Sequence, residues 1–415
     1  MGGALLHICY ITTVVPYGTA ETFILHEIDA VQRQGHSVEV IPIRPEDALQ
    51  TPGYRVWHCR ALGGACLGLA VKFFLRHPLR SITACAPMLF RAGGLKKALK
   101  NLYFFPKALA TAAHLQQEPA GFIHAHWLAT TASVAYIASR LTGIPWGATG
   151  HRWDIYEHNA LGPKFRTAAF IRTIDQRGAA HLRGLAPQAL AEKIHVVHMG
   201  IHPEASPRIH VRPPDRPLRL CMPANLVAVK GHRFVLEAFR LLLEQGFTAF
   251  TCIFAGDGEL RAEIDAQIRR YGLTETVQLA GHVPNRELLD AYRRGEVDLV
   301  LLPSLELSDS EHEGIPVSLM EAMACGIPVL ATATGGIPEL LRDGAGLLIP
   351  QQDPRALADA IRRMAEDGVL YRKTAEKGLA RVQADFDYDR NIQSLLKLMA
   401  PSPHEPQDKE ERRHA

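Results

Sequence analysis

A chain of 415 residues is too long for one ordinary domain, and its length favours two or three domains of about 150 residues each. Hydrophobic residues make up 47% of the chain and charged residues 21%, which is enough apolar mass for two full cores. The net charge of +3 argues against a nucleic-acid partner, and no run of about 18 apolar residues indicates a membrane-spanning helix.

The seven cysteines are scattered along the chain and lack the CxxC or Cys/His spacing of a zinc site. We interpret them as buried, reduced thiols. The first residues enter a strand-like run without the basic region and cleavage site of a signal peptide. We therefore expect a cytoplasmic protein.

The first half of the chain alternates strands with helices. Residues 5–11 form a continuous apolar run, as expected for a strand buried on both faces of a parallel sheet. The other predicted strands of this half are 36–43, 122–126, 145–151 and 193–201, and the clearest helices are 21–34 and 131–141. This alternation predicts a doubly wound α/β domain over residues 1–202.

The pattern fails at 203–217, where the text PEASPRIHVRPPDRP is rich in proline and charge and predicts an interdomain linker. The alternation then restarts and predicts a second doubly wound domain over 218–385. We expect residues 386–400 to form a helix that packs back on the first domain. Residues 401–415 lack apolar anchors and predict a disordered tail.

A basic and apolar segment, residues 55–107, interrupts the first domain. The chain has no acidic residue between Asp47 and Glu118. The ten basic residues of the segment are Arg55, Arg60, Lys72, Arg76, Arg80, Arg91, Lys96, Lys97, Lys100 and Lys107. They lie among many apolar and aromatic residues, which predicts a helix pair in peripheral contact with an anionic inner leaflet. The alternatives are a helical insertion with a solvated basic face, or a phosphate-rich acceptor site.

The text EGIPVSLMEAMACGIP predicts a ligand site in the second domain. Pro316 suits the first position of a helix, and the free amides near Val317 and Ser318 would form an anion site at its start. Glu313 comes just before this start, and Glu321 lies about 7 Å further along the helix axis. Two carboxylates so placed can bind hydroxyl groups on opposite sides of a diphosphate.

This text, extended as EGIPVSLMEAMACGIPVLATATGGIPE, resembles the signature of the retaining group 1 glycosyltransferase family, which has the GT-B fold. FAGDGELRAEI, GHVPNRELLDAYRRGEVDLVLLPS and HVVHMGI are similar to further parts of that family. ITTVVPYGTAETFILHEI, IHAHW and TGHRWDIY resemble its exopolysaccharide and colanic-acid branch. The resemblance covers most of residues 5–395. It implies two Rossmann-like domains that face each other across a cleft, the first on the acceptor side.

The resemblance also implies roles for single residues. Glu313 would contact the donor sugar, Lys230 would neutralise the diphosphate of the leaving group, and His151 would lie near the sugar. These three are the expected catalytic residues. The implied donor-binding residues are Glu321, which would bind the ribose, and Gly314, Ile315, Pro316, Val317, Ser318, Asn225, Gly256 and Val283. The implied acceptor-side residues are Gly18, Thr19, His126 and Asp154, the last of which would support His151.

Asn225 stands where the family usually has an arginine that contacts the diphosphate. Asparagine can donate a hydrogen bond but carries no charge. Either a nearby basic residue, His232 or Arg233, compensates, or the leaving group is less well stabilised.

The resemblance implies transfer of a hexose-type sugar from a UDP- or GDP-sugar to a lipid-linked or saccharide acceptor, with retention of configuration. We expect no metal ion and no cofactor. The acidic text ADFDYD at 384–389 is interpreted as a turn and helix cap. Two alternatives remain: an isomerase of the nucleotide-sugar 2-epimerase type, and a non-catalytic glycosyltransferase-like subunit. Asn225 favours the second alternative, whereas Glu313, Glu321 and Lys230 argue against it.

Overall fold

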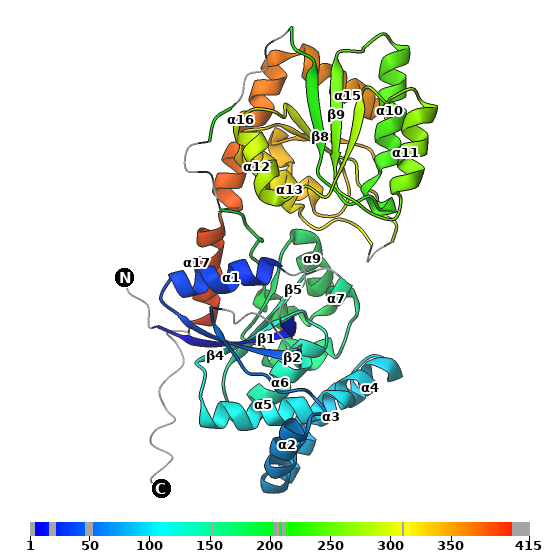
Figure 1. Ribbon diagram of the computed structural model, residues 1–415. Coiled ribbons are helices and arrows are strands. Elements are labelled where there is room, and N and C mark those ends of the chain that lie inside the picture. Colours follow the sequence, from blue (N-terminus) through cyan, green and yellow to red (C-terminus); the bar gives the residue numbers. More distant parts are fainter. Residues whose placement is uncertain are drawn as a thin grey trace. The chain divides into compact units, whose positions relative to one another are not determined.

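The computed structural model shows two compact units (Figure 1). The residues it describes are 5–15, 22–45, 53–151, 153–202, 204, 207–209, 213, 215–308 and 311–400. Two expected acceptor-side residues, Gly18 and Thr19, lie outside the described residues, as do parts of the predicted linker and the whole predicted tail. The first unit comprises Met1–Thr173, Gly178–Val197 and Ile392–Ala415, and the second comprises Ile174–Arg177 and His198–Asn391.

The first unit is built on a parallel sheet of seven strands in the order β3-β2-β1-β4-β5-β6-β7. Its strands are β1 (His7–Val15), β2 (Ser37–Pro45), β3 (Arg55–Val56), β4 (Phe122–His126), β5 (Trp146–Gly150), β6 (Phe170–Thr173) and β7 (Ile194–Val196). Every residue of β4 and β5 is buried, because helices cover both faces of the sheet. Position 147 requires glycine because the ring of Phe170 packs against it, and a Cβ there would lie 2.8 Å from that ring.

The helices of the first unit include α6, which is buried along nearly its whole length and packs against α5 and β4. The helices are α1 (Thr22–Arg33), α2 (Gly64–Arg76), α3 (Pro78–Phe90), α4 (Leu95–Tyr103), α5 (Phe105–Gln117), α6 (Thr130–Thr142), α7 (Trp153–Tyr156), α8 (Leu161–Thr167), α9 (Gln176–Leu185) and the short η1 (Gln188–Lys193). The first two residues of α9 are grouped with the second unit.

The basic segment 55–107 differs from its prediction in two ways. It forms three helices, α2 to α4, and the start of α5, where a helix pair was expected. Pro78 begins α3, and Gly93 and Gly94, both at positive φ, separate α3 from α4. Lys107, which was grouped with the basic residues of a surface, is fully buried, and its Nζ donates to the carbonyl of Cys59 at 2.7 Å. Burial lowers the pKa of Lys107 to about 8.

The second unit is built on a parallel sheet of six strands in the order β10-β9-β8-β11-β12-β13. Its strands are β8 (Leu218–Met222), β9 (Phe250–Ala255), β10 (Val277–Gly281), β11 (Leu299–Leu302), β12 (Val329–Thr332) and β13 (Leu347–Ile349). The order of strands reverses between β8 and β11. In doubly wound folds, ligands bind beyond the carboxyl ends of the strands at such a reversal.

The helices of the second unit cover this sheet around a core of its own. They are η2 (Ala228–Lys230), α10 (His232–Glu244), α11 (Arg261–Arg270), α12 (Asn285–Arg293), α13 (Val317–Ala324), α14 (Ile337–Leu340), η3 (Arg342–Gly344), α15 (Pro354–Glu366), α16 (Gly368–Asp385) and α17 (Tyr388–Met399). From Ile392 onward, α17 is grouped with the first unit. As predicted, the acidic text before α17 acts as a cap: Asp387 accepts from the amide of Arg390.

Two consecutive Rossmann-like parallel sheets confirm the α/β fold expected from the alternation of strands and helices. Among the helices of the described residues, none combines the length and the apolar character that a membrane span requires.

Candidate active site

The second unit places the start of α13 beyond the carboxyl end of β11. The helix was expected to begin at Pro316, but Pro316 is the residue before it, with extended backbone (φ −72°, ψ 121°). Leu319 donates the first hydrogen bond of the helix, to the carbonyl of Pro316, so the helix itself leaves the amides of Val317 and Ser318 without partners. The first turn contains no acidic residue. This helix start can therefore bind an anion.

Glu313 lies beside this helix start and is nearly buried. Its Oε1 forms an ion pair with Nζ of Lys230 and accepts a hydrogen bond of 2.9 Å from Oγ of Ser304. The structure thus brings together two of the three expected catalytic residues. Their partner Ser304 was not predicted, because no pattern in the sequence distinguishes it from an ordinary strand-end serine.

Two glycines hold the chain against Glu313. A Cβ at Gly335, which has φ +55°, would lie 1.8 Å from the carbonyl oxygen of Glu313, and a Cβ at Gly336 would lie 2.9 Å from Gly314. The turn that carries Lys230 is equally tight, since a Cβ at Gly231 would lie 2.1 Å from the carbonyl oxygen of Pro303. Glycine is therefore required at each of these three positions, because any side chain there would collide with the neighbouring backbone.

Glu321 lies further along α13 and accepts a hydrogen bond of 2.9 Å from Nδ2 of Asn285, the first residue of α12. Burial raises the pKa of Glu321, and the bond from Asn285 only partly opposes this effect. A hydroxyl donor from a ligand would favour the charged form of this carboxylate. Asn285 was not predicted as a site residue, although it stands in the quoted text GHVPNREL.

The remaining expected donor-binding residues of this unit follow neighbouring strands. Asn225 follows β8 and Gly256 follows β9; a Cβ at Gly256 would meet the backbone of Ala224 at 2.1 Å and the amide of Asn225 at 3.2 Å. Val283 is half-buried in the loop after β10. Because the carboxyl ends of parallel strands share one edge of the sheet, these residues lie along the same edge as Glu313.

Of the two basic residues considered as replacements for the missing arginine, His232 is unsuitable. Its ring is buried against Phe254, and burial lowers its pKa to about 4, so it is neutral at ordinary pH. Arg233 is exposed, and its guanidinium lies 4.5 Å from the centroid of the Phe234 ring. Of the two residues, only Arg233 carries a charge at ordinary pH.

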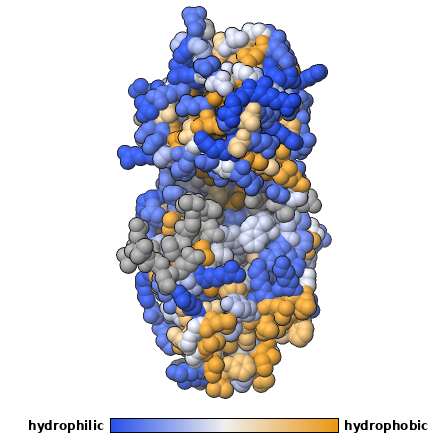
Figure 2. Space-filling view, turned by 45° about the vertical axis from the view of Figure 1, so that its right-hand side comes forward, coloured by the Kyte–Doolittle hydropathy of each residue, from blue (hydrophilic) through white to orange (hydrophobic). Residues whose placement is uncertain are grey.

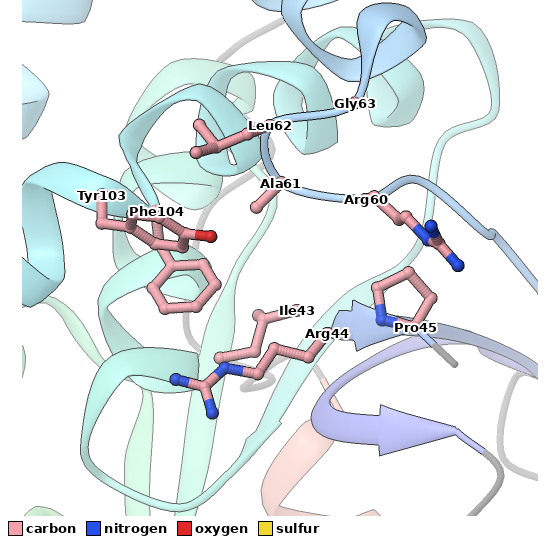
Figure 3. Close-up of a pocket in the computed structure, with 9 residues that line it drawn as sticks. All are labelled: Ile43, Arg44, Pro45, Arg60, Ala61, Leu62, Gly63, Tyr103 and Phe104. Atoms are coloured by element: carbon pink, nitrogen blue, oxygen red, sulfur yellow. The ribbon is translucent and has the colours of Figure 1, made fainter. Parts of the chain in front are cut away.

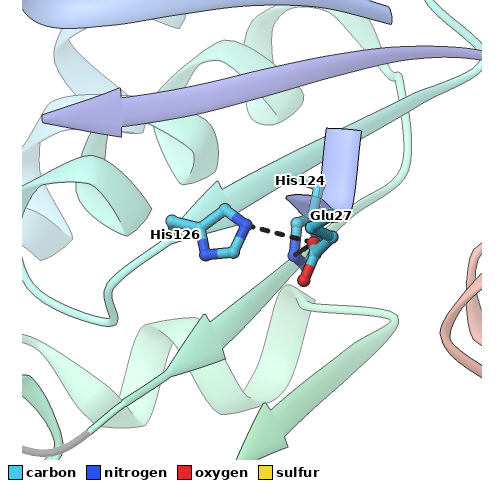
Figure 4. A group of neighbouring side chains, drawn as sticks. All are labelled: Glu27, His124 and His126. Atoms are coloured by element: carbon cyan, nitrogen blue, oxygen red, sulfur yellow. Dashed lines mark hydrogen bonds and ion pairs between the residues drawn. The ribbon is translucent and has the colours of Figure 1, made fainter. Parts of the chain in front are cut away.

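In the first unit, His126 ends β4 and His151 follows β5. Nδ1 of His126 lies 2.9 Å from Nε2 of His151. Nε2 of His126 lies 3.1 Å from Oε1 of the α1 residue Glu27, as Figure 4 shows. Asp154 accepts hydrogen bonds from the backbone amides of His151, at 3.0 Å, and Leu128, at 2.7 Å. The structure therefore brings His126, His151 and Asp154 together and adds Glu27, which was not predicted.

Glu27 is fully buried and charged. Burial alone would raise its pKa, but His126 and Arg172 hold the pKa well below its usual range. Nη1 of Arg172 lies 2.7 Å from Oε2 of Glu27, and the hydroxyl of Tyr10 donates to Oε1 at 3.2 Å. Burial lowers the pKa of His151, so its ring is neutral.

The atoms of Glu27, His124 and His126 lie within 4.8 Å of one another, close enough to hold a metal ion (Figure 4). However, the guanidinium of Arg172 already neutralises the carboxylate and would repel a buried divalent ion. We therefore interpret the cluster as a hydrogen-bonded chain. Nε2 of His126 lies within hydrogen-bond distance of Glu27, and Nδ1 of the same ring lies within hydrogen-bond distance of Nε2 of His151, so the chain runs from Glu27 through His126 to His151.

Comparison with known proteins places this geometry in a family. The family model for glycosyl transferases group 1 matches residues 206–381, which include α13 and both glutamates. The protein named "Putative colanic acid biosynthesis glycosyltransferase WcaL" of Salmonella typhimurium is 30% identical over 402 residues, which cover 92% of this chain and 96% of that protein. The chain belongs to the group 1 glycosyltransferases.

A further relative, "Amylovoran biosynthesis glycosyltransferase AmsK" of Erwinia amylovora, is 36% identical over 216 residues, which cover 50% of this chain and 51% of that protein. Among solved structures, Anabaena HepE in complex with UDP has a TM-score of 0.67 at 18% identity and covers 94% of this chain and 99% of its own. A glycosyltransferase from Rickettsia africae has a TM-score of 0.66 at 15% identity and covers 95% and 98%. These likenesses show the GT-B fold and confirm the resemblance drawn from the sequence.

Proposed function

We propose that this glycosyltransferase moves a hexose-type sugar from a nucleoside-diphosphate sugar to a lipid-linked or saccharide acceptor, with retention, during cell-surface polysaccharide synthesis. The observation that carries the proposal is the ion pair of Lys230 and Glu313 beside the open start of α13. The relatives named for colanic acid and amylovoran synthesis support the polysaccharide assignment. Anabaena HepE, solved with UDP, supports a uridine nucleotide as the first donor to test.

The proposed donor position follows from the groups around α13. The diphosphate would lie against the amides of Val317 and Ser318, where the helix dipole favours an anion. Glu321, held by Asn285, would accept hydrogen bonds from the ribose hydroxyls. The ammonium group of Lys230 would leave Glu313 and pair with the phosphate. The Glu313 carboxylate would then bind the sugar.

In the proposed transfer, the bond between the anomeric carbon and the donor phosphate breaks while the acceptor oxygen approaches from the same face. Negative charge grows on the leaving phosphate, and Lys230 and the helix amides stabilise that charge. The leaving phosphate takes the proton of the acceptor hydroxyl, so the products are the glycoside and a nucleoside diphosphate. From the first unit, we propose that His151 takes part in transfer and that the chain through His126 and Glu27 fixes its tautomer.

Two substitutions test this proposal. Glu321→Ala should weaken UDP binding, because it removes the carboxylate proposed for the ribose. Glu313→Ala should leave UDP binding largely intact and reduce sugar transfer. Thermal shift against UDP concentration measures the first effect, since a ligand that binds the native state stabilises it. Release of UDP from a UDP-sugar with acceptor present measures the second.

The exposed Glu287 on α12 provides the matched control, and Glu287→Ala should leave both measurements unchanged. Equal UDP affinity in the wild type and in Glu321→Ala would refute the donor position. Conversion of a UDP-sugar into an isomer without any acceptor would favour an isomerase of the 2-epimerase type.

We further propose that the protein works at the cytoplasmic face of the membrane as a peripheral protein. All seven cysteines are buried and free, which suits a reducing compartment. The acid-free segment 55–107 suits contact with anionic lipid.

A further inference from the structure

The helices α2, α3 and α4 expose rows of apolar side chains at helical spacing. On α2, Leu67, Val71 and Leu75 follow one another at intervals of four residues, and Leu75 is 73% exposed. Residues at this spacing lie on one face of a helix. On α3 the exposed apolar residues are Leu79, Ile82 and Phe90, and on α4 they are Leu95, Leu99, Leu102 and Tyr103.

These outward rows are distinct from the rows that bind the helices to the protein. On α2 the buried residues are Cys66, Ala70 and Phe73, which face the rest of the first unit. The helix therefore carries two apolar faces, and packing within the unit uses only one of them. Figure 2 shows a hydrophobic area at the lower end of the molecule, where Figure 1 places α2, α3 and α4. We call the exposed residues of these helices the α2–α4 surface.

Exposed basic residues lie among these apolar rows. They are Lys72, Arg76, Arg80, Arg91 and Lys96. Since the chain has no acidic residue between Asp47 and Glu118, no carboxylate from this segment offsets their charge. Phe90 is 88% exposed and Leu79 78%, so the most exposed apolar side chains neighbour the basic residues Arg91 and Arg80. An apolar area with positive charge at its margin is complementary to an anionic bilayer.

A pocket of about 410 Å³ adjoins this surface (Figure 3). Arg44 and Arg60 line it together with Leu62, Tyr103 and Phe104, and the guanidinium of Arg44 lies 5.7 Å from the centroid of the Phe104 ring. Gly63, the residue before α2, also lines the pocket, and the first turn of α2 has neither a capping side chain nor an acidic residue. Arg44 and Arg60 lie on opposite sides of the pocket in Figure 3, and the exposed guanidinium of Arg44, together with the helix start, favours a phosphate.

We infer that the α2–α4 surface docks on an anionic lipid bilayer, and that the adjoining pocket takes a headgroup phosphate. Leu62 and Tyr103 are half exposed and also line the pocket, so they connect the apolar surface with the phosphate site. Leu75, Leu79 and Phe90 enter the region of the acyl chains, and the basic residues contact neighbouring headgroups. This inference rests on the membrane contact in the proposed function and assigns that contact to the outer faces of α2, α3 and α4 and to a headgroup phosphate.

Vesicle flotation of the full chain tests the inference. The wild type should float with vesicles of phosphatidylcholine mixed with phosphatidylglycerol, and much less with vesicles of phosphatidylcholine alone. The combined variant Leu75→Ser, Leu79→Ser and Phe90→Ser should lose about tenfold or more of this binding, because binding scales with the apolar area inserted. The control Val369→Ser changes a side chain that is equally exposed, at 78%, but lies on the second unit, and it should bind as the wild type does.

The pocket is tested by Arg44→Ala, which should reduce flotation with the anionic vesicles, with the exposed Arg286→Ala on α12 as control. Unchanged flotation of either the triple variant or Arg44→Ala would overturn the corresponding part of the inference. Equal binding of the wild type to both kinds of vesicle would overturn the lipid class. Displacement from vesicles by inorganic phosphate at constant ionic strength would show a site for the free anion instead.

Two further measurements separate the remaining outcomes. If the surface joins two copies of the chain, light scattering will find a wild-type dimer that the triple variant converts to a monomer, and the inference is wrong. UDP thermal shift should be the same in the wild type and the triple variant, because the changed residues lie on the first unit. A wild type that floats with anionic vesicles but does not bind UDP would contradict the donor proposal and leave the docking surface supported.

Discussion

The carboxylate of Glu27 connects four side chains, of which only His126 and His151 were expected at the site. Tyr10, His126 and Arg172 all contact it directly, and His151 joins through His126. Arg172 stands 145 residues from Glu27, and neither residue belongs to a local charge pattern. Their pairing follows from the parallel order of β1, β4, β5 and β6, which only the assembled sheet reveals.

Replacing Glu27 by glutamine should destabilise the protein by about 3–5 kcal/mol, because it leaves the buried charge of Arg172 without its partner. Urea unfolding measures the change. Glu118→Gln is the matched control: this glutamate pairs with Arg55 at the surface, where an ion pair contributes at most about 1 kcal/mol. If Glu27→Gln loses no more free energy of unfolding than the control, the buried ion pair contributes no more to stability than the surface pair does.

The buried ring of His232 should make stability depend on pH. Neither ring nitrogen has a hydrogen-bond partner among the described residues, and burial lowers the pKa of the ring to about 4. The unfolded chain, with an ordinary pKa of about 6.5, therefore binds the proton first as pH falls. Titration of this histidine thus leaves stability unchanged near neutral pH and lowers it as the pH falls from about 6.5 to about 4, by on the order of 3 kcal/mol.

His232→Phe should remove this part of the pH dependence, which urea unfolding at several pH values measures as a difference from the wild type. Above about pH 7.5 the His232 ring is neutral in both states, so the stability difference between the wild type and His232→Phe should be constant there, which serves as the control. An identical slope in the wild type and His232→Phe would contradict the pKa assigned to the buried ring.

At the scale of single elements, the sequence predicted the strands and helices that a local pattern of apolar residues marks. The apolar runs at 5–11 and 122–126 lie within or overlap β1 and β4, and the helix predicted over 131–141 is α6. The start of α13 was misplaced by one residue, because the fixed φ of proline suits both the last extended position and the first helical one.

The sequence showed that the segment of α2 to α4 is basic and apolar, but it did not show which side chains of these helices are exposed. The sequence of α2 contains two apolar rows one residue apart, such as those of Ala70 and Val71, and it does not show which of the two rows is buried. Only the packing of α2 against α5 decides which row remains exposed. Lys107 was misassigned for the same reason, because its burial depends on the carbonyl of Cys59 from a distant loop.

Gly335→Ala tests how the loop after β12 positions the acidic residue. The new Cβ would overlap the carbonyl oxygen of Glu313, at a φ that alanine rarely adopts. We expect a loss of about 1–3 kcal/mol and reduced sugar transfer, since the loop must move Glu313 to make room. Gly368→Ala, where nothing lies within 4 Å, should leave activity unchanged. Full activity in Gly335→Ala would show that this loop does not position Glu313 for sugar transfer.

At the scale of the whole molecule, each unit has its own sheet and its own hydrophobic core. Calorimetry should therefore resolve two unfolding transitions. UDP should raise the midpoint of only the transition that belongs to the second unit, because every residue proposed to bind the donor nucleotide lies there. A single transition, or an equal shift of both, would contradict this independence.

The confinement of Asn225, Lys230, Glu313 and Glu321 to one unit has an evolutionary consequence. Under the proposed division of donor and acceptor binding, a gene that exchanged its first half with that of a relative would keep its choice of activated sugar and inherit a new choice of recipient. Such recombination would produce new polymer linkages without rebuilding the nucleotide pocket. Chimeras joined between Val197 and Leu218 are the natural way to look for that inheritance.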